Sequence, residues 1–220
     1  MTRRSVTPVL FSIALAPSLT GQQTVVSLPA PKKDGGMSVE SALAARRSIR
    51  TYTRQSLTIA EVGQLLWAAQ GVTSSDGKRT APSAMHRYPL EIAVVVRNVE
   101  GLTGGAYRYL PAKHALELLT PAGSGNDILA PAASQPQVTA APAVFVIAAV
   151  YERMGAGAKN RTWTDYEAGL ASENLLLEAV SLHLGAVVTG GIDLEQVKKA
   201  VRFAGSEQVV VVIPAGHLTE

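Results

Sequence analysis

Three apolar runs limit the possible folds of this chain more than any other feature of its sequence. They are EIAVVVRNV at 91–99, AVFVIAAVY at 143–151 and QVVVVIPAG at 208–216, and β-branched residues are frequent in each. A strand with one face in water alternates apolar and polar residues, whereas a strand buried on both faces is a continuous apolar run. We therefore expect a central strand at 91–99, a second central strand at 143–151 and a last strand at 208–216.

Short polar residues that cap helices mark three further elements. Thr58 and Glu61 have the spacing of a capping box, in which each side chain binds the backbone amide of the other residue. Ser38 and Asp193 are also suitable caps, because their side-chain oxygens accept hydrogen bonds from the first turn of a helix. The expected helices cover 38–45, 58–69 and 193–201.

A long apolar segment at 163–184 predicts the largest helix. One face of this helix is formed by residues three or four positions apart, namely Ala168, Ala171, Leu175, Ala179 and Leu182. A helix this apolar is buried in the core of a domain or in a subunit interface. Two shorter strands, at 106–110 and 115–119, flank Pro111 and predict a hairpin. Together the elements indicate an α+β fold, in which a mixed β-sheet is flanked by helices.

The first residues of the chain have the pattern of a secretory signal peptide. MTRRS is basic, and VTPVLFSIALAPSLTG is an apolar stretch that ends in small and polar residues. We place this leader at 1–21. A disordered or interfacial N-terminus is the alternative, and Arg3 with Arg4 also permits a twin-arginine signal. The expected location is outside the cytoplasm, periplasmic or extracytoplasmic, if the leader functions, and cytoplasmic otherwise.

The rest of the chain divides into a linker and one domain. Residues 22–37 are rich in Pro, Gly and Lys without sustained periodicity, which is typical of a linker. Residues 38–220 are long enough for one compact domain. The leader itself is not expected to be a membrane anchor, because Pro8 and Pro17 bracket a run too short to cross a bilayer. We also expect no stable membrane span after removal of the leader.

Composition excludes several kinds of function. The chain has no cysteine, which excludes disulfides, thiolate nucleophiles and iron–sulfur clusters. Two of its 20 basic residues, Arg3 and Arg4, lie in the expected leader, so that 18 remain against 17 acidic residues. This near balance gives no reason to expect nucleic acid as a partner. The four histidines have no spacing typical of metal ligands, and we expect no metal site.

An arginine-rich segment follows the first expected helix. Arg46, Arg47, Ser48 and Arg50 lie within five residues of one another. Guanidinium groups and a hydroxyl in such a cluster can hold a phosphate through bidentate hydrogen bonds. The alternative is that these cations only favour the C-terminus of the helix.

Two other segments are candidates for ligand binding. The loop at 79–89 is bounded by prolines and enters the first central strand, a place where ligand contacts are frequent, although an ordinary connection is the alternative. At Gly190 and Gly191 the absence of side chains lets a planar ligand approach the backbone amides. A simple turn is the alternative there.

Six collinear motifs resemble the nitroreductase superfamily, and in particular its SagB-type dehydrogenase branch. The resemblance covers the chain from Val39 to its C-terminus. The motifs are ALAARRSIRTYT, LTIAEVGQLLWAAQGVT, RTAPSAMHRYPLEIAVVV, VEGLTGGAYRYLPAKHALELL, EAGLASENLLLEAVSLHLGAVVTGGID and VVVIPAGH. The resemblance implies a nitroreductase-like fold and an obligate homodimer that holds FMN at the subunit interface, with 163–184 as the interface helix.

The same resemblance implies roles for individual residues. Arg46, Arg47 and Ser48 would hold the phosphate and ribityl chain of FMN. Arg50 would lie near the pyrimidine edge of the flavin, where a positive charge stabilises the anionic reduced ring. The residues that would come from the partner subunit to border the cofactor are Pro82, Ser83, Ala84 and Met85. Gly190 and Gly191 would present a backbone amide to flavin N5.

Three departures from the pattern bear on the substrate. Met85 stands where related loops carry a small residue, so access to the flavin ring is expected to differ. Members that oxidise azolines in peptides carry a Lys-Tyr pair before the long helix, and the region YERMGAGAKNRTWTDYEAG has no such pair. A basic residue that the superfamily often adds after the last strand is also missing, and His217 would replace it only in part.

The resemblance implies an FMN-dependent oxidoreductase that acts on a small molecule. Hydride or electrons would pass through flavin N5 from a donor such as NAD(P)H to a nitro compound, a quinone or a related acceptor, or the enzyme would dehydrogenate its substrate. The alternatives are a non-catalytic FMN-binding partner subunit of a modification complex, and chemistry that consumes the flavin. A leader favours a donor other than free NAD(P)H, because that donor is expected inside the cell.

Overall fold

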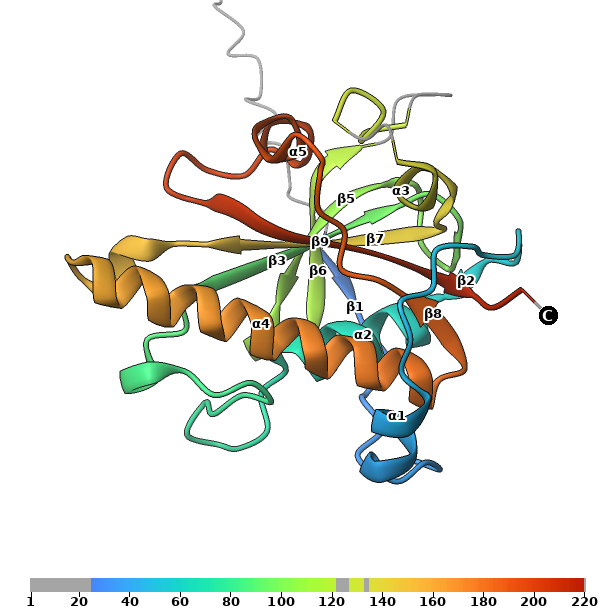
Figure 1. The fold of residues 1–220 in the computed structure, drawn as a ribbon, viewed down its shortest axis with the longest axis horizontal. Coiled ribbons are helices and arrows are strands. Elements are labelled where there is room, and N and C mark those ends of the chain that lie inside the picture. The colour runs from blue at the N-terminus through green and yellow to red at the C-terminus, as the bar shows by residue number, and fades with distance from the viewer. Residues whose placement is uncertain (1–24, 122–126, 133–134, 220) are drawn as a thin grey trace, which may run out of the picture.

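A sheet of seven strands, in the order β1-β6-β5-β3-β7-β9-β8, forms the centre of the protein, and every neighbouring pair is antiparallel. The computed structural model describes residues 25–121, 127–132 and 135–219, and the expected signal peptide lies outside them. Figure 1 shows the strands fanning out between two layers of helices. The strands are β1 (Val25–Ser27), β3 (Leu90–Val96), β5 (Gly105–Leu110), β6 (Ala115–Pro121), β7 (Ala143–Ala149), β8 (Leu184–Ala186) and β9 (Gln208–His217).

The two central strands, β3 and β7, are buried on both faces. All of β7 is buried, and so is all of β3 except Glu91. Successive residues of β3 point to opposite faces, so that Ile92 and Val94 join one core cluster while Ala93 and Val95 join the other. The prediction from the continuous apolar runs is therefore confirmed.

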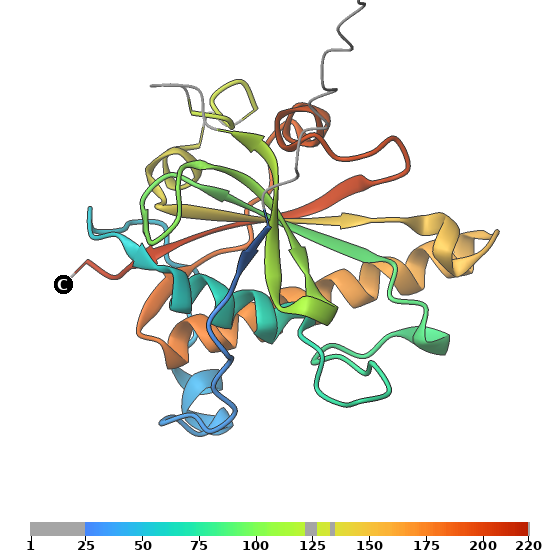
Figure 2. The same ribbon diagram turned by 180° about the vertical axis from the view of Figure 1, so that it is seen from behind.

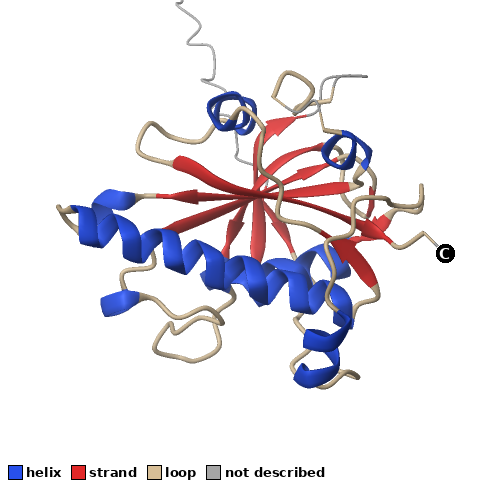
Figure 3. Cartoon of the chain, viewed as in Figure 1, coloured by secondary structure: helices blue, strands red, loops and turns tan. Residues whose placement is uncertain are grey.

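Helices cover both faces of the sheet, as expected for this α+β fold (Figure 3). The core cluster on one face is completed by α2 (Ile59–Gln70) and α4 (Ala158–Ser181). The cluster on the other face is completed by α3 (Pro136–Ala140) and α5 (Leu194–Val201). No helix among the residues that the structure describes combines the length and the hydropathy needed to cross a bilayer.

The helix starts predicted from capping residues are confirmed. Thr58 and Glu61 form both hydrogen bonds of the capping box of α2. The Ser38 side chain accepts a hydrogen bond from an amide in the first turn of α1 (Val39–Ala45). At the start of α5 the Asp193 carboxylate accepts a hydrogen bond from the Gln196 amide at 3.0 Å. These boundaries depend on neighbours in sequence, which is why the sequence predicts them well.

Among the residues that the structure describes, parallel pairing occurs in two places. Strands β2 (Leu57–Thr58) and β4 (Val99–Glu100) form a separate parallel pair, and Ser48 makes a parallel bridge to Ala186 of β8. The hairpin predicted around Pro111 is present as β5 and β6, which a 3-10 turn at Pro111–Lys113 connects.

Part of the predicted linker belongs to the sheet. Val25–Ser27 form β1, which pairs with β6, and the Leu28 amide continues this pairing by donating to the His114 carbonyl at 3.0 Å. Figure 2 shows β1, in blue, along the β5–β6 hairpin. The edge of β6 offers unpaired backbone groups that this short segment satisfies. Three residues are too few to show strand periodicity in the sequence.

The long helix is shifted relative to its prediction. α4 begins at Ala158 instead of 163 and ends at Ser181 instead of 184. Its first turn is polar, so no apolar stripe in the sequence indicates where the helix begins. At the other end His183 adopts a φ of 56°, in the left-handed region, and ends the helix two residues before Gly185.

Candidate functional site

The arginine-rich segment lies along the edge of the sheet. Arg46 is the C-cap of α1, and beyond it the backbone becomes extended. Ser48 then bridges to Ala186, and the Ile49 amide donates to the Ala186 carbonyl at 3.2 Å. The segment therefore covers the outer side of β8, and these backbone contacts hold it in place.

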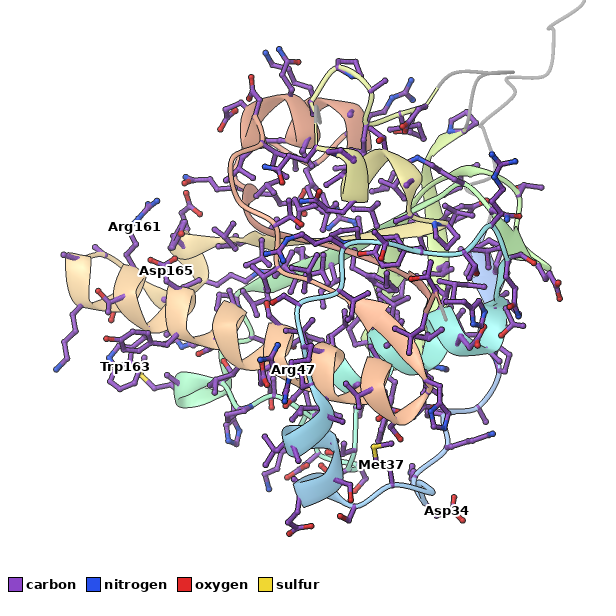
Figure 4. The ribbon with its side chains drawn as sticks, turned by 45° about the vertical axis from the view of Figure 1, so that its right-hand side comes forward. Asp34, Met37, Arg47, Arg161, Trp163 and Asp165 are labelled. Carbon is purple, nitrogen blue, oxygen red and sulfur yellow. The ribbon has the colours of Figure 1, made fainter. Side chains whose placement is uncertain are left out.

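The three arginines of this segment have different surroundings. Arg47 donates to the carbonyls of Ala44 at 3.0 Å and Arg46 at 2.7 Å, which are free at the end of α1, and Figure 4 shows it beside that helix end. The Arg46 side chain is half-buried, with its Nε 3.7 Å from a carboxylate oxygen of Glu173 on α4. Arg50 is exposed. Only Arg47 thus fits the simpler interpretation that these cations bind the helix C-terminus.

The glycine turn follows β8 directly. The Thr189 amide donates to the Val212 carbonyl of β9 at 2.9 Å, which fixes the start of the turn. Gly191 has a φ of 69°, and the Gln135 side chain donates a hydrogen bond to the Gly190 carbonyl. The amides of Gly190 and Gly191 donate to no acceptor within the part of the chain that the structure describes. Both glycines are exposed, so a ligand can reach these amides.

Two of the three candidate segments therefore meet at one edge of the sheet. Ala186 pairs with the Ser48 segment, and the chain reaches Gly190 four residues later. Figure 1 shows the chain between α1 and β2 running beside the chain that leaves β8. Within a single chain, the arginine segment thus pairs with the strand that leads into the glycine turn. Arginines and free backbone amides are suited to an anionic ligand with a flat body.

The third candidate segment, the loop that contains Pro82–Met85, lies against the first half of α4. The Ala84 amide donates to Glu167 Oε1 at 2.8 Å, and the Tyr88 amide donates to the Ser83 hydroxyl, also at 2.8 Å. Among the described residues, no hydrogen bond or ion pair joins Pro82–Met85 to the arginine segment or to the glycine turn. One chain therefore does not bring all three segments together.

The conformation of this loop is unusual. Met85, His86 and Tyr88 have φ values of 55°, 54° and 45°. Residues other than glycine rarely adopt this left-handed region, so tertiary contacts must hold the loop in place. Met85 is 66% exposed.

The outer face of α4 is apolar as well as the inner one. Ala168, Ala171 and Leu175 of the predicted face are buried against the sheet. Trp163, Tyr166 and Leu170, at helical spacing, are exposed, and Figure 4 shows Trp163 projecting outward from the first half of the helix. Exposed aromatic residues in such a row are typical of an interface with another protein chain.

Two side chains have surroundings that bear on the site. Glu167 lies nine residues after the start of α4 and is buried, which raises its pKa by desolvation. Its position four residues before Ala171, which lies on the buried face, is the signal in the sequence for this burial. His217 points to Glu61 of α2, with its Nε2 3.7 Å from a carboxylate oxygen.

Comparison with known proteins identifies the family of this chain. The model of the nitroreductase family matches residues 43–217. A protein of Methanocaldococcus jannaschii that carries the name nitroreductase is 35% identical over 184 residues, which cover 83% of this chain and 92% of that protein.

Solved structures agree with this result. A structure from Ralstonia eutropha JMP134, described as a nitroreductase, is 30% identical and has a TM-score of 0.78 over 98% of this chain and 97% of its own. A structure from Desulfovibrio desulfuricans, described as a nitroreductase in complex with FMN, is 24% identical and has a TM-score of 0.59 over 83% and 87% of the two chains. The fold, the family match and the M. jannaschii relative agree, and this chain belongs to the nitroreductase family of oxidoreductases.

Proposed function

We propose that this protein is an FMN-dependent oxidoreductase of the SagB-type branch. It would transfer hydride between a donor such as NAD(P)H and a small organic acceptor, a nitro compound, a quinone or a related molecule, or dehydrogenate its substrate. The observation that carries this proposal is the meeting of the arginine segment and the glycine turn at the edge of β8. The branch assignment depends on the six sequence motifs.

The residues at this edge fit the parts of FMN. Arg46 has one long, half-exposed contact with Glu173, which a phosphate dianion can replace because it accepts two parallel hydrogen bonds from a guanidinium group. Ser48 is exposed beside it. Arg47 already donates to two carbonyls, so we expect its backbone and not its side chain to face the phosphate.

The opposite end of the site suits the ring of the cofactor. Arg50 is exposed and supplies a fixed positive charge, which stabilises negative charge on a bound ring. A Cβ atom on Gly190 would meet no atom within 4 Å, so the backbone there is open to a flat ligand. When bound, FMN supplies the centre that accepts and donates hydride.

We further propose a homodimer in which Pro82–Met85 of each subunit border the cofactor held by the other. Two observations support this arrangement. No hydrogen bond or ion pair among the described residues joins the loop to the arginine segment of the same chain, and α4 exposes Trp163, Tyr166 and Leu170. A charge in this row should separate the subunits. We expect Tyr166→Glu to be monomeric in sedimentation experiments, whereas Lys199→Glu, at an exposed position of α5, should remain dimeric. A dimeric Tyr166→Glu protein would contradict this interface.

Titration with FMN tests the cofactor directly. Protein purified and incubated with FMN should show a bound flavin spectrum, and Arg50→Ala should weaken FMN binding about 10-fold to 100-fold, as expected for loss of one charged contact. Arg54→Ala, which changes an exposed arginine four residues further on, is the matched control and should bind as the wild type does. A wild-type protein that binds no flavin would refute the proposed function.

The electron donor and the location of the protein are tested together. We propose that residues 1–21 are a signal peptide and that the mature protein, with its flavin domain in 38–220, works outside the cytoplasm. N-terminal sequencing of the mature protein from its host would show cleavage near residue 21. Rapid anaerobic bleaching of the flavin by NADPH would support the reductase direction, and its absence would favour dehydrogenation of a substrate. FMN binding without turnover on any donor or acceptor would indicate a non-catalytic partner subunit.

A further inference from the structure

A buried carboxylate connects the interior of the protein to the loop around Met85. Glu167 lies on the inner face of α4 and is only 4% exposed. Burial is unfavourable for a carboxylate unless hydrogen bonds or a cation compensate it. No Lys, Arg or His among the described residues forms an ion pair with Glu167. A buried carboxylate without a cation therefore indicates a role that an apolar side chain such as alanine or leucine could not fulfil.

The hydrogen bonds of Glu167 indicate that role. Its Oε1 accepts a hydrogen bond from the Ala84 amide at 2.8 Å, which favours the charged form of the carboxylate. Its Oε2 is buried without a partner among the described residues. The Ser83 hydroxyl in turn accepts the Tyr88 amide at 2.8 Å. The Ser83 hydroxyl thus joins the two ends of the turn from Ser83 to Tyr88, and the Ala84 amide connects this turn to one carboxylate on α4.

This turn needs such a support. Three of its residues, Met85, His86 and Tyr88, have left-handed backbone conformations that are unfavourable for residues with a side chain. The other hydrogen bonds of the turn join residues of the loop to one another, except that Arg153 donates to the Tyr88 carbonyl at 3.1 Å. The contact with Glu167 is the one that fixes the turn at Ala84, directly beside Met85.

We propose that Glu167 is a positioning residue, which holds Ser83–Met85 against α4 and thereby sets where the exposed Met85 side chain lies over the active site. The part of this inference that concerns the active site rests on the proposed function, in which this loop borders the flavin of the partner subunit. Glu167 itself is buried behind the loop and touches neither cofactor nor substrate. Its effect on the flavin is exerted through the Ala84 amide.

Two variants separate the acceptor from the charge. Glu167→Ala removes the acceptor of the Ala84 amide, whereas Glu167→Gln keeps an oxygen acceptor and removes the charge. Asp165→Ala is the matched control, because Asp165 is an exposed acidic residue of the same helix whose carboxylate binds the Tyr151 hydroxyl at 2.6 Å. Loop protection is measured without FMN, by hydrogen exchange at the Ala84 amide and by the rate of tryptic cleavage after Arg87.

We expect hydrogen exchange and tryptic cleavage to become about tenfold faster or more in Glu167→Ala, because the Ala84 amide loses its acceptor. Glu167→Gln and Asp165→Ala should stay within about twofold of the wild type. In the holoprotein, Glu167→Ala should change the visible circular dichroism of the bound flavin, and Glu167→Gln should restore it. Wild-type loop protection in a folded Glu167→Ala protein would overturn the inference.

A further variant, on the loop side of the hydrogen bond, provides the test if Glu167→Ala does not fold. Ala84→Pro removes the same hydrogen bond from the side of the loop, and proline is well suited to the first position of a helical turn such as Ala84–His86. Faster cleavage after Arg87 in Ala84→Pro supports the inference, and an unchanged rate contradicts it. Since these measurements need no cofactor, they are independent of FMN binding: absence of flavin binding by the wild type refutes the proposed function alone.

Discussion

Alanine at Gly190 and at Gly191 should separate the two roles that a glycine turn can have. Gly191 has a φ of 69°, and a Cβ atom there would lie 2.9 Å from the Nε2 atom of Gln135. At Gly190 a Cβ atom would meet nothing within 4 Å. Gly191→Ala therefore tests the turn itself, and Gly190→Ala tests the approach of a ligand to the backbone.

The two substitutions differ in their expected effect on stability. Alanine in the left-handed region costs about 1–2 kcal/mol, and displacement of Gln135 from the Gly190 carbonyl adds about 0.5–1.5 kcal/mol. For a domain of this size each kcal/mol lowers Tm by about 2–4 °C, so Gly191→Ala should melt roughly 3–14 °C lower. Gly190→Ala should change the free energy of unfolding by less than about 0.5 kcal/mol.

For FMN binding we expect the opposite order, with the larger effect from Gly190→Ala. Because a methyl group on Gly190 keeps a planar ring from the backbone, we expect Gly190→Ala to weaken FMN binding about tenfold or more. Thermal unfolding of the apoprotein and titration with FMN measure the two effects separately. Wild-type FMN binding by Gly190→Ala would contradict the role of Gly190 in ligand approach. A wild-type melting temperature of Gly191→Ala would contradict the role of Gly191 in the turn.

Three further predictions concern the fold and its titration. Thr58→Ala should reduce the free energy of unfolding by about 1 kcal/mol in urea titrations, because the capping box of α2 is lost; an unchanged midpoint would contradict this. Leu175→Ala should cost about 2–5 kcal/mol, since Leu175 is fully buried, whereas exposed Leu170→Ala should affect dimerisation instead; equal losses of stability would refute the assignment of the two faces. Burial raises the pKa of Glu167, so the carboxylate ionises less readily in the folded protein than in the unfolded chain. Between about pH 4 and about pH 8 the wild type should therefore lose stability relative to Glu167→Gln. Urea titrations at both pH values would measure this difference in the free energy of unfolding.

The sequence predicts the local features of this fold well. Capping residues such as Thr58 and Asp193 act on amides two or three positions away, and both are confirmed. The continuous apolar runs predict the central strands, because burial on both faces is visible in composition alone. β1 escaped prediction because its three residues become a strand only through pairing with β6.

The candidate site could be predicted only in part for the same reason. The arginine segment and the glycine turn are recognisable from their residues, but their meeting at β8 depends on one bridge between residues 48 and 186. The left-handed backbone of Met85 has no local signal, since it is imposed by contacts such as that between Ala84 and Glu167. The role of Glu167 follows from the register of α4 against the sheet, which the sequence does not specify.

The segment that carries Arg46 and Arg50 is also the cover of an edge strand. β8 pairs with β9 on one side, and the backbone of Ser48 and Ile49 occupies the other. An uncovered edge strand is a template for pairing with strands of other molecules, and so promotes aggregation. Release of this segment would expose β8 together with the apolar residues next to it. Any anion that binds Arg46 and Arg50 should therefore also keep the protein soluble on heating, since it holds the cover in place.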